Sequence, residues 1–355
     1  MTTVTEPQDQ VERVEGVKGA PLLEIKDLFM HFTVKGEGAV GLRKAKVRAV
    51  DGVSLTLREG ETLGLVGESG CGKSTTGRLI TRLLQPTSGQ ILYRGHDIAK
   101  LKERQLRPYR RELQLIFQDP YSSLNPRQTV GTIIGTALRV HNMVPKGREL
   151  GRVQELLEVV GLNPEHYNRY PHEFSGGQRQ RIGIARALAV QPKVIIADEP
   201  VSALDVSIQA QVMNLLEDLR KEFGIAFIFI AHDLGVVRHF CDRVAVMYLG
   251  RIAEIGSRDA VYGQPHHPYT QALLSAVPDP GVVRGTPPKA RIRLQGDVPS
   301  PINPPSGCRF RTRCWKAEEI CATTEPQLER KGHNGDAACH FAEAPKRSIL
   351  AELPD

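Results

Sequence analysis

Short apolar runs recur along the chain and predict its buried strands. They are TLGLV (62–66), VIIAD (194–198) and IAFIFIAH (225–232), and LQLIFQ (113–118) predicts a further strand. Each run is short for a helix and lacks the polar alternation of a strand with one wet face, which is typical of strands covered on both sides. Between two of them, residues 206–223 carry apolar side chains at helical spacing, namely Val212, Leu215, Leu216, Leu219 and Phe223. This alternation predicts an α/β fold with a parallel sheet at its core.

The first part of the chain has a different pattern. Residues 22–32 and 47–57 alternate as half-buried strands do, and a loop rich in Gly and Lys (35–46) separates them. Residues 1–20 are polar, which predicts a flexible tail.

Two further segments stand out. Residues 129–160 are largely helical in pattern, with a break near Pro145 and Gly147. Eight prolines between Pro278 and Pro305 predict extended chain rather than helix or sheet. No internal repeat is visible.

A glycine-rich loop follows the first buried run and opens a predicted helix (73–84). Its sequence, GESGCGKS, matches the pattern G-x-x-x-x-G-K-[ST]. Glycines let the backbone turn several N–H groups toward one phosphate, and the helix start adds its positive dipole end. The residues expected to bind ATP are Gly67, Glu68, Ser69, Gly70, Cys71, Gly72, Lys73, Ser74 and Thr75, with Ser74 also a ligand of Mg²⁺. Cys71 is expected to be a small filler rather than a reactive thiol.

An acidic pair ends the run at 194–198. Asp198 is expected to hold Mg²⁺, and Glu199 to orient or deprotonate the attacking water. Taken alone, such a pair also occurs at ordinary strand ends. Beside a phosphate-binding loop, in a chain with parallel strands, it favours ATP hydrolysis.

A second anion-binding helix start lies at FSGGQ (174–178). Here the sequence resembles the ATP-binding cassette (ABC) ATPases, whose signature usually reads LSGGQ. The resemblance implies a RecA-like parallel-sheet core, an antiparallel β subdomain and a helical subdomain. It also implies that two cassettes pack head to tail, so that one chain's signature contacts the ATP held by the other. The signature residues are Ser175, Gly176, Gly177 and Gln178.

Other motifs of the ABC ATPases follow in order. The resemblance makes Gln118 the Q-loop residue that touches Mg²⁺ and the attacking water, and His232 the switch residue that contacts the γ-phosphate. Ser202 and Asp205 belong to the D-loop, which crosses the dimer interface. Phe32 is the candidate for stacking on adenine, although it could equally be a core residue.

The segment HPYTQALL (267–274) resembles the region that follows the cassette in dipeptide and oligopeptide importers. The resemblance implies an ATPase subunit that powers peptide uptake. Its partners would be a second ATPase chain, more often a different one, two transmembrane permease subunits and an extracytoplasmic peptide-binding protein. Nickel and glutathione importers share this architecture and stay open as alternatives.

Four of the six cysteines cluster near the end of the chain, at Cys308, Cys314, Cys321 and Cys339. Four thiolates can bind a [4Fe–4S] cluster or Zn²⁺, and unliganded thiols are the third alternative. The resemblance favours the cluster. His333 or His340 could replace one cysteine at a zinc site. The basic residues Arg309, Arg311, Arg313 and Lys316 are expected to offset the thiolate charge.

Composition adds little to this picture. Apolar residues at 40% and charged residues at 25% suit a chain with a sizeable core, and the formal charge of +7 suits a phosphate ligand, a nucleic acid or an anionic membrane surface. The first residues lack the features of a secretory signal, and no apolar run is long enough to cross a bilayer. We therefore expect a cytoplasmic protein held peripherally at the membrane by partner chains.

A soluble ABC ATPase acting on nucleic acid or ribosomes is the alternative from another class. Members that act on nucleic acid carry a long coiled-coil insertion, and members that act on ribosomes carry two cassettes in one chain. Neither feature is present in the sequence. We expect no nucleic acid partner. The expected organisation is a tail (1–20), an ABC ATPase domain (21–265) with a helical subdomain at about 119–180, a C-terminal extension (266–345) and a tail (346–355).

Overall fold

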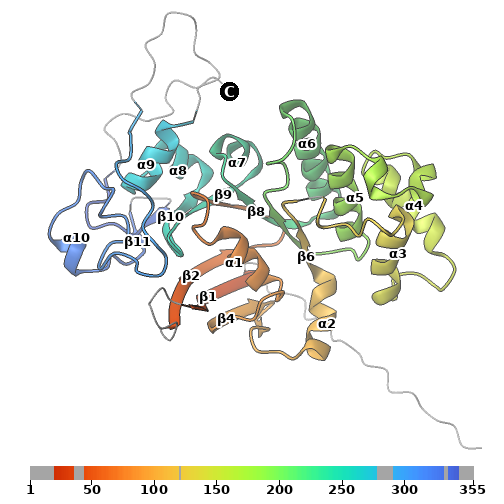
Figure 1. Ribbon diagram of the computed structural model, residues 1–355, viewed down its shortest axis with the longest axis horizontal. Coiled ribbons are helices and arrows are strands. Elements are labelled where there is room, and N and C mark those ends of the chain that lie inside the picture. The colour runs from red at the N-terminus through yellow and green to blue at the C-terminus, as the bar shows by residue number, and fades with distance from the viewer. Residues whose placement is uncertain (1–19, 36–43, 120, 278–290, 332–334, 344–355) are drawn as a thin grey trace, which may run out of the picture.

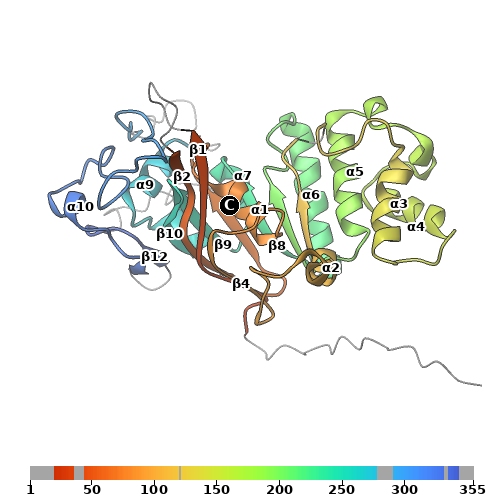
Figure 2. The same ribbon diagram turned by 60° about the horizontal axis from the view of Figure 1, so that its bottom comes forward.

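The computed structural model describes residues 20–35, 44–119, 121–277, 291–331 and 335–343. Most of both predicted tails, the centre of the loop at 35–46, His333 and most of the first half of the proline-rich stretch lie outside these residues. Figures 1 and 2 show the helical part at one end of the molecule, the last part of the extension at the other, and the sheets between them.

Within the described residues, the larger sheet has eight strands in the order β11-β12-β10-β9-β3-β8-β7-β6. Its parallel part is formed by β9 (Arg243–Tyr248), β3 (Thr62–Val66), β8 (Ala226–Ala231), β7 (Val194–Asp198) and β6 (Leu113–Ile116). The other three strands are antiparallel, namely β10 (Arg251–Ser257), β12 (Gly335–Ala337) and β11 (Glu329–Arg330). The predicted parallel core is confirmed.

Both faces of the parallel strands are covered, which explains their continuous apolar sequences. Along β7, Ile195 and Ala197 pack into one hydrophobic cluster, whereas Val194 and Ile196 pack into the other. Successive side chains of a strand point to opposite faces, so no position on such a strand can be polar without cost. The core therefore holds the strand ends, where the motifs lie, in fixed positions.

The smaller sheet is antiparallel, in the order β2-β1-β4-β5. Its strands are β1 (Leu23–Lys35), β2 (Lys44–Leu57), β4 (Ser88–Tyr93) and β5 (His96–Asp97). The strand β2 begins at Lys44, inside the predicted loop, because it pairs with β1 as far as Lys35.

The helices that cover the core sheet are α1 (Lys73–Ile80), α2 (Glu103–Glu112), α6 (Val206–Phe223), α7 (Leu234–Phe240), α8 (Arg258–Gly263) and α9 (Pro268–Ser275). The helix α1 ends four residues earlier than predicted. Arg82 adopts a left-handed φ of 55°, and the N–H groups of Leu83 and Leu84 both bond to the carbonyl of Arg78. This turn replaces the last predicted helical turn.

The helical part consists of α3 (Val130–Val140), α4 (Glu149–Val159) and α5 (Gly176–Leu188), with 3₁₀ turns at Pro164–Asn168 and Pro171–Glu173. The predicted break between α3 and α4 is confirmed, and Gly147 there has a φ of 86°. In Figure 1 α5 lies on the opposite side of β6 from α1.

The extension runs back along the cassette. Residues 291–319 contain no helix or strand, as the prolines predict for the described part, and α10 (Ile320–Thr323) is a single turn. The strand β12 pairs with β10, and the N–H of Arg48 donates to the carbonyl of Pro301 at 3.0 Å. Throughout the described ranges, helices fall short of the length and apolar character needed to cross a membrane.

Candidate functional site

The phosphate loop (67–74) joins β3 to α1 and is tightly curled. Gly72 has a φ of 109°, and a Cβ there would collide with the carbonyl oxygen of Ala49. Only glycine fits such a position. Lys73 is buried, and its ammonium donates to the carbonyls of Gly67 (2.8 Å) and Glu68 (3.1 Å). The loop thus encloses a cation.

The rim of the loop faces solvent. Ser69 and Gly70 are exposed, while Ser74 and Thr75 are half-buried in the first turn of α1, whose N–H groups have no partner within the helix. A helix start of this kind suits an anion. Cys71 is buried, and burial raises the pKa of its thiol, in keeping with a filler role.

Ser74 and Asp198 meet across the two strand ends. The Ser74 hydroxyl donates to the Asp198 carboxylate at 2.7 Å. Asp198 is only 1% exposed, and its pKa is raised, mainly by burial, although the Ser74 hydrogen bond and the charge of Arg78 oppose this. A buried carboxylate beside a hydroxyl offers the oxygen ligands that Mg²⁺ prefers. The fit to Mg²⁺ is therefore good.

Glu199 lies where several segments converge. The Gln118 amide donates to its Oε2 at 2.9 Å, and the His232 Nδ1 lies 3.4 Å from the same oxygen. The Ser202 hydroxyl donates to the Glu199 main-chain carbonyl at 3.1 Å. Glu199 has a left-handed φ of 46°, a strained conformation that is typical of functional sites. Three segments that lie far apart in the sequence, those of Gln118, Glu199 and His232, thus meet here.

The signature forms the start of α5. Ser175 is exposed and caps the helix, with its hydroxyl accepting from the Gln178 N–H (3.3 Å) and its own N–H donating to the Gln178 side chain (3.0 Å). Gly176 lies half-buried beside it, and Gly177 packs against Ile208 of α6 with no room for a Cβ. This helix start belongs to α5, which lies apart from α1, the helix that follows the chain's own phosphate loop, in both views.

Two other predicted residues have simpler surroundings. Phe32 is half-buried on β1, opposite Val47 of β2. Asp205 is exposed directly before α6, next to Val206, whose exposed fraction of 82% is high for an apolar side chain.

The four clustered cysteines approach one another. Burial raises the pKa of Cys308 to about 11, with smaller contributions from the nearby sulfurs of Cys321, Cys339 and Cys314. The Cys308 N–H donates to the Cys321 carbonyl at 2.8 Å. Within the described ranges, however, no three His, Cys, Asp or Glu side chains are arranged to hold a metal ion. The predicted metal at these cysteines therefore stays a prediction, and His340 contacts the Thr324 carbonyl.

The prediction for the nearby arginines was wrong. Arg309 pairs with Asp51, Arg311 bonds to Ser306, and Arg313 pairs with Glu68 of the phosphate loop. Lys316 alone behaves as expected among these four residues, since its charge lowers the pKa of Cys314 and Cys339. Sequence reasoning missed the contacts of Arg309 and Arg313 because no local pattern marks residues that meet across more than 200 positions.

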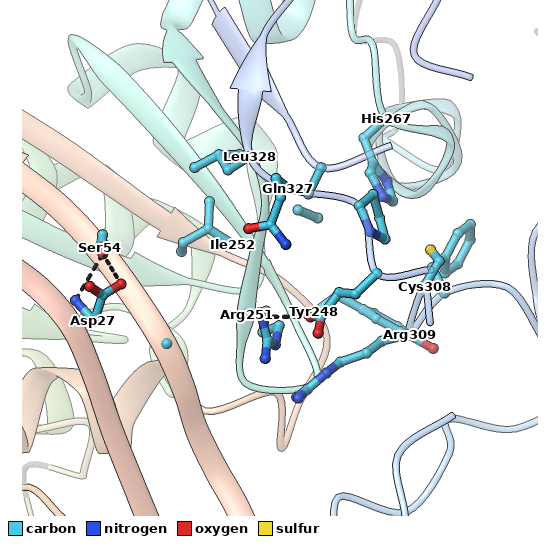
Figure 3. Close-up of a pocket in the computed structure, with 16 residues that line it drawn as sticks. Asp27, Ser54, Tyr248, Arg251, Ile252, His267, Cys308, Arg309, Gln327 and Leu328 are labelled. Atoms are coloured by element: carbon cyan, nitrogen blue, oxygen red, sulfur yellow. Dashed lines mark hydrogen bonds and ion pairs between the residues drawn. The ribbon is translucent and has the colours of Figure 1, made fainter. Parts of the chain in front are cut away.

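A cavity of about 320 Å³ lies at the junction of the two sheets and the extension. Figure 3 shows Asp27 and Ser54 of the small sheet on one side of it, and His267, Cys308 and Arg309 on the other. Residues of the phosphate loop do not line it. It therefore marks the seam between cassette and extension rather than the ATP site.

Two family models match the chain. Residues 50–202 match the ABC transporter model, and residues 253–321 match the oligopeptide/dipeptide transporter, C-terminal region. The second match covers the HPYT segment and three of the four cysteines.

Curated relatives match nearly the whole chain. A putative oligopeptide transport ATP-binding protein, YkfD of Bacillus subtilis, is 55% identical over 90% of this chain and 95% of its own length. AppF, an oligopeptide transport ATP-binding protein of the same organism, is 53% identical over 90% of this chain and 97% of its own length.

Among solved structures, the dimeric cassette MJ0796 in a post-hydrolysis state with ADP and Pi has a TM-score of 0.59 and 29% identity. That match covers 66% of this chain and 98% of the other. The site geometry, the family models and the relatives agree, and the chain belongs to the ATP-binding subunits of oligopeptide-type ABC transporters, ATPases whose hydrolysis is coupled to transport.

Proposed function

We propose that the hydrolytic centre of this ATPase is built around Glu199, as the general base for water. The observation that carries this proposal is the convergence of Gln118 and His232 on one oxygen of Glu199, next to the Ser74–Asp198 pair. A base must lie within reach of the water's proton and must be oriented by its neighbours. Gln118 and His232 are placed to hold Glu199 and to sense the γ-phosphate.

The phosphate loop binds the nucleotide. Lys73 exchanges its contacts with the loop carbonyls for the β- and γ-phosphates, and the loop N–H groups from Gly70 to Thr75 cradle the chain of phosphates. Ser74, Asp198 and Gln118 would hold Mg²⁺. When bound, Mg²⁺ neutralises charge that develops on the phosphate oxygens. Phe32 is proposed to stack on adenine.

The ATP-binding site is completed by the signature of a second cassette. Ser175 to Gln178 form a helix start, with Ser175 exposed at its tip, that lies apart from the chain's own loop and suits an anion. Val206, highly exposed beside the D-loop residues Ser202 and Asp205, suits burial at an interface. The solved cassette with a similar fold is a dimer. We propose that the partner is a different ATPase chain.

The remaining partners follow from the family. Two transmembrane permease subunits would hold the chain at the cytoplasmic face of the cell membrane, and an extracytoplasmic binding protein would deliver the peptide. The relatives that match nearly the whole chain are named for oligopeptide transport, which favours di- and oligopeptides as cargo over nickel or glutathione. The domains are proposed to be the cassette (21–265), with its helical subdomain at about 119–180, and the extension (266–345).

Glu199→Gln tests the hydrolytic role. The variant should keep ATP affinity, lose hydrolysis and accumulate as an ATP-bound dimer, measured by phosphate release and light scattering. Glu222→Gln, at an exposed position near the end of α6, is the matched control and should turn over normally. Normal turnover in Glu199→Gln would overturn the assignment.

For the cysteines we propose a [4Fe–4S] cluster held by Cys308, Cys314, Cys321 and Cys339. Each thiolate of such a cluster binds a different iron, so the sulfurs lie further apart than around a single ion. The proximity of Cys314, Cys321 and Cys339 to Cys308 supports a shared site, and the resemblance to peptide importers favours the cluster over Zn²⁺. Iron, sulfide and zinc analysis of the protein purified without oxygen tests it, and zinc without sulfide would contradict it.

A further inference from the structure

Arg313 reaches from the cysteine-containing part of the extension into the phosphate loop. Its guanidinium contacts both carboxylate oxygens of Glu68, at 2.6 and 3.0 Å. The Arg313 side chain is only 7% exposed. Such a two-pronged ion pair fixes direction as well as distance, because the planar guanidinium matches the carboxylate.

The same loop residue has a second anchor in the extension. The Glu68 N–H donates to the hydroxyl of Tyr269 at 2.9 Å. Tyr269 is fully buried and packs against Tyr248 and Phe310, with ring centroids 4.7 and 5.4 Å away. The main chain and the side chain of Glu68 are therefore both held by residues that follow the cassette.

A second arginine holds the structure beside the loop. Arg309 pairs with the buried Asp51 of β2 and donates to the carbonyl of Leu249. The next residue, Gly250, donates its N–H to the carbonyl of Cys71 inside the loop at 2.8 Å. Arg309 and Arg313 come from one short segment (308–314), so this segment supports the loop at two points.

The negative charge of Glu68 would oppose ATP binding without a positively charged partner such as Arg313. Glu68 is the acidic residue of a loop that is otherwise made to receive an anion. An unpaired carboxylate there would repel the phosphates of ATP, and the repulsion is strong at a partly buried site. Pairing with Arg313 removes this repulsion.

We propose that Arg313 is a positioning residue for ATP binding, which acts by neutralising and holding Glu68. The C-terminal extension then sets the affinity of the phosphate loop for ATP. This inference rests on the proposed ATP site, and it assigns to the extension a part in nucleotide binding.

The first test is Arg313→Met in the full chain. We expect the Kd for MgATP to rise about ten-fold, as expected when a charge-assisted bond near an anion site is lost. In the complex with its membrane partners, KM should rise by a similar factor while kcat changes less than about two-fold. Circular dichroism and thermal unfolding report whether the variant is folded.

Glu68→Gln separates the charge role from a purely structural one. In this variant Arg313 is freed to face the phosphates, so ATP binding should tighten. The double variant Glu68→Gln with Arg313→Met should recover most of the affinity that Arg313→Met loses. If the pair were merely structural, both single variants would weaken ATP binding alike, and the double variant would not recover the lost affinity.

Arg311→Met is the matched control, because Arg311 lies in the same segment and bonds to Ser306 instead. It should bind ATP as the unchanged chain does. An equal loss of ATP affinity in Arg311→Met, or no loss of ATP affinity in a folded Arg313→Met, would overturn the inference. Failure of the unchanged chain to bind ATP would instead overturn the proposed function.

Discussion

In the cassette, β3, β7 and β8 place the phosphate loop, Asp198 and His232 at one edge of a sheet that is buried on both faces. In the extension, residues 291–319 contain no helix or strand and are held by ion pairs, aromatic packing and backbone contacts to the cassette. The first region is ordered by its own apolar pattern. The second takes its order from the first, and in return it contacts the loop that binds ATP.

Asp198→Asn separates function from stability in the cassette. The amide keeps the contact with Ser74 but removes the buried charge, so hydrolysis should fall about a thousand-fold, the scale of losing a key electrostatic group. Because burial raises the pKa of Asp198, its ionised form opposes folding, and the variant should be at least as stable as the unchanged chain. Phosphate release and urea unfolding measure the two effects. A large loss of stability would contradict this account.

Phe310→Ala and Phe227→Ala compare the two regions directly. Both side chains are buried, Phe310 in the extension and Phe227 in β8. Each change should cost about 3–5 kcal/mol in the free energy of unfolding, as large aromatic deletions in cores do. If the extension were loosely attached, Phe310→Ala would cost far less. Urea unfolding followed by fluorescence and circular dichroism decides between these results.

His267 makes the seam between the regions sensitive to acid. Burial lowers the pKa of His267 to about 4, and its Nδ1 accepts from the Tyr269 N–H, which requires the neutral ring. Glu254, which faces it, opposes this shift only in part. Protonation therefore opposes folding, and stability should fall by up to about 3 kcal/mol as the pH falls from 6.5 to 4.

His267→Asn removes this titration while keeping an acceptor at the start of α9. The difference in stability between the two proteins should change across that pH range and stay constant above pH 7. Unfolding curves at a series of pH values measure it, and parallel curves throughout would contradict the prediction.

Gly224→Ala probes the smallest effect, at the end of α6. Gly224 has a φ of 61°, and no atom lies within 4 Å of the position of a Cβ there. The cost should therefore be backbone strain alone, about 1 kcal/mol. Thermal unfolding with Gly263→Ala as control, where φ is ordinary and the space is also open, isolates that strain.

The sequence predicts β3, β7 and α6 to the residue, because continuous apolar runs and helical spacing are local signals. It also predicts the phosphate loop, because the glycines and the lysine all lie within the segment 67–74. It does not predict which basic residue pairs with Glu68, since 47 Lys and Arg and 40 Asp and Glu offer many combinations. The resemblance places Gln118 at the site, but its contact with Glu199 is not predicted, because folding brings together residues 81 positions apart.

The pairing of β12 with β10 has a consequence for how such a chain can vary. The strand β10 is covered on its outer side by residues 335–337, and the Ala338 N–H adds a bond to the carbonyl of Ala253 at 2.8 Å. A cassette cut near residue 265, where we propose that the extension begins, would expose this edge, and exposed strand edges recruit other strands and aggregate. Exchange of cassettes between transporters, in evolution or by engineering, would therefore have to carry the extension along with them.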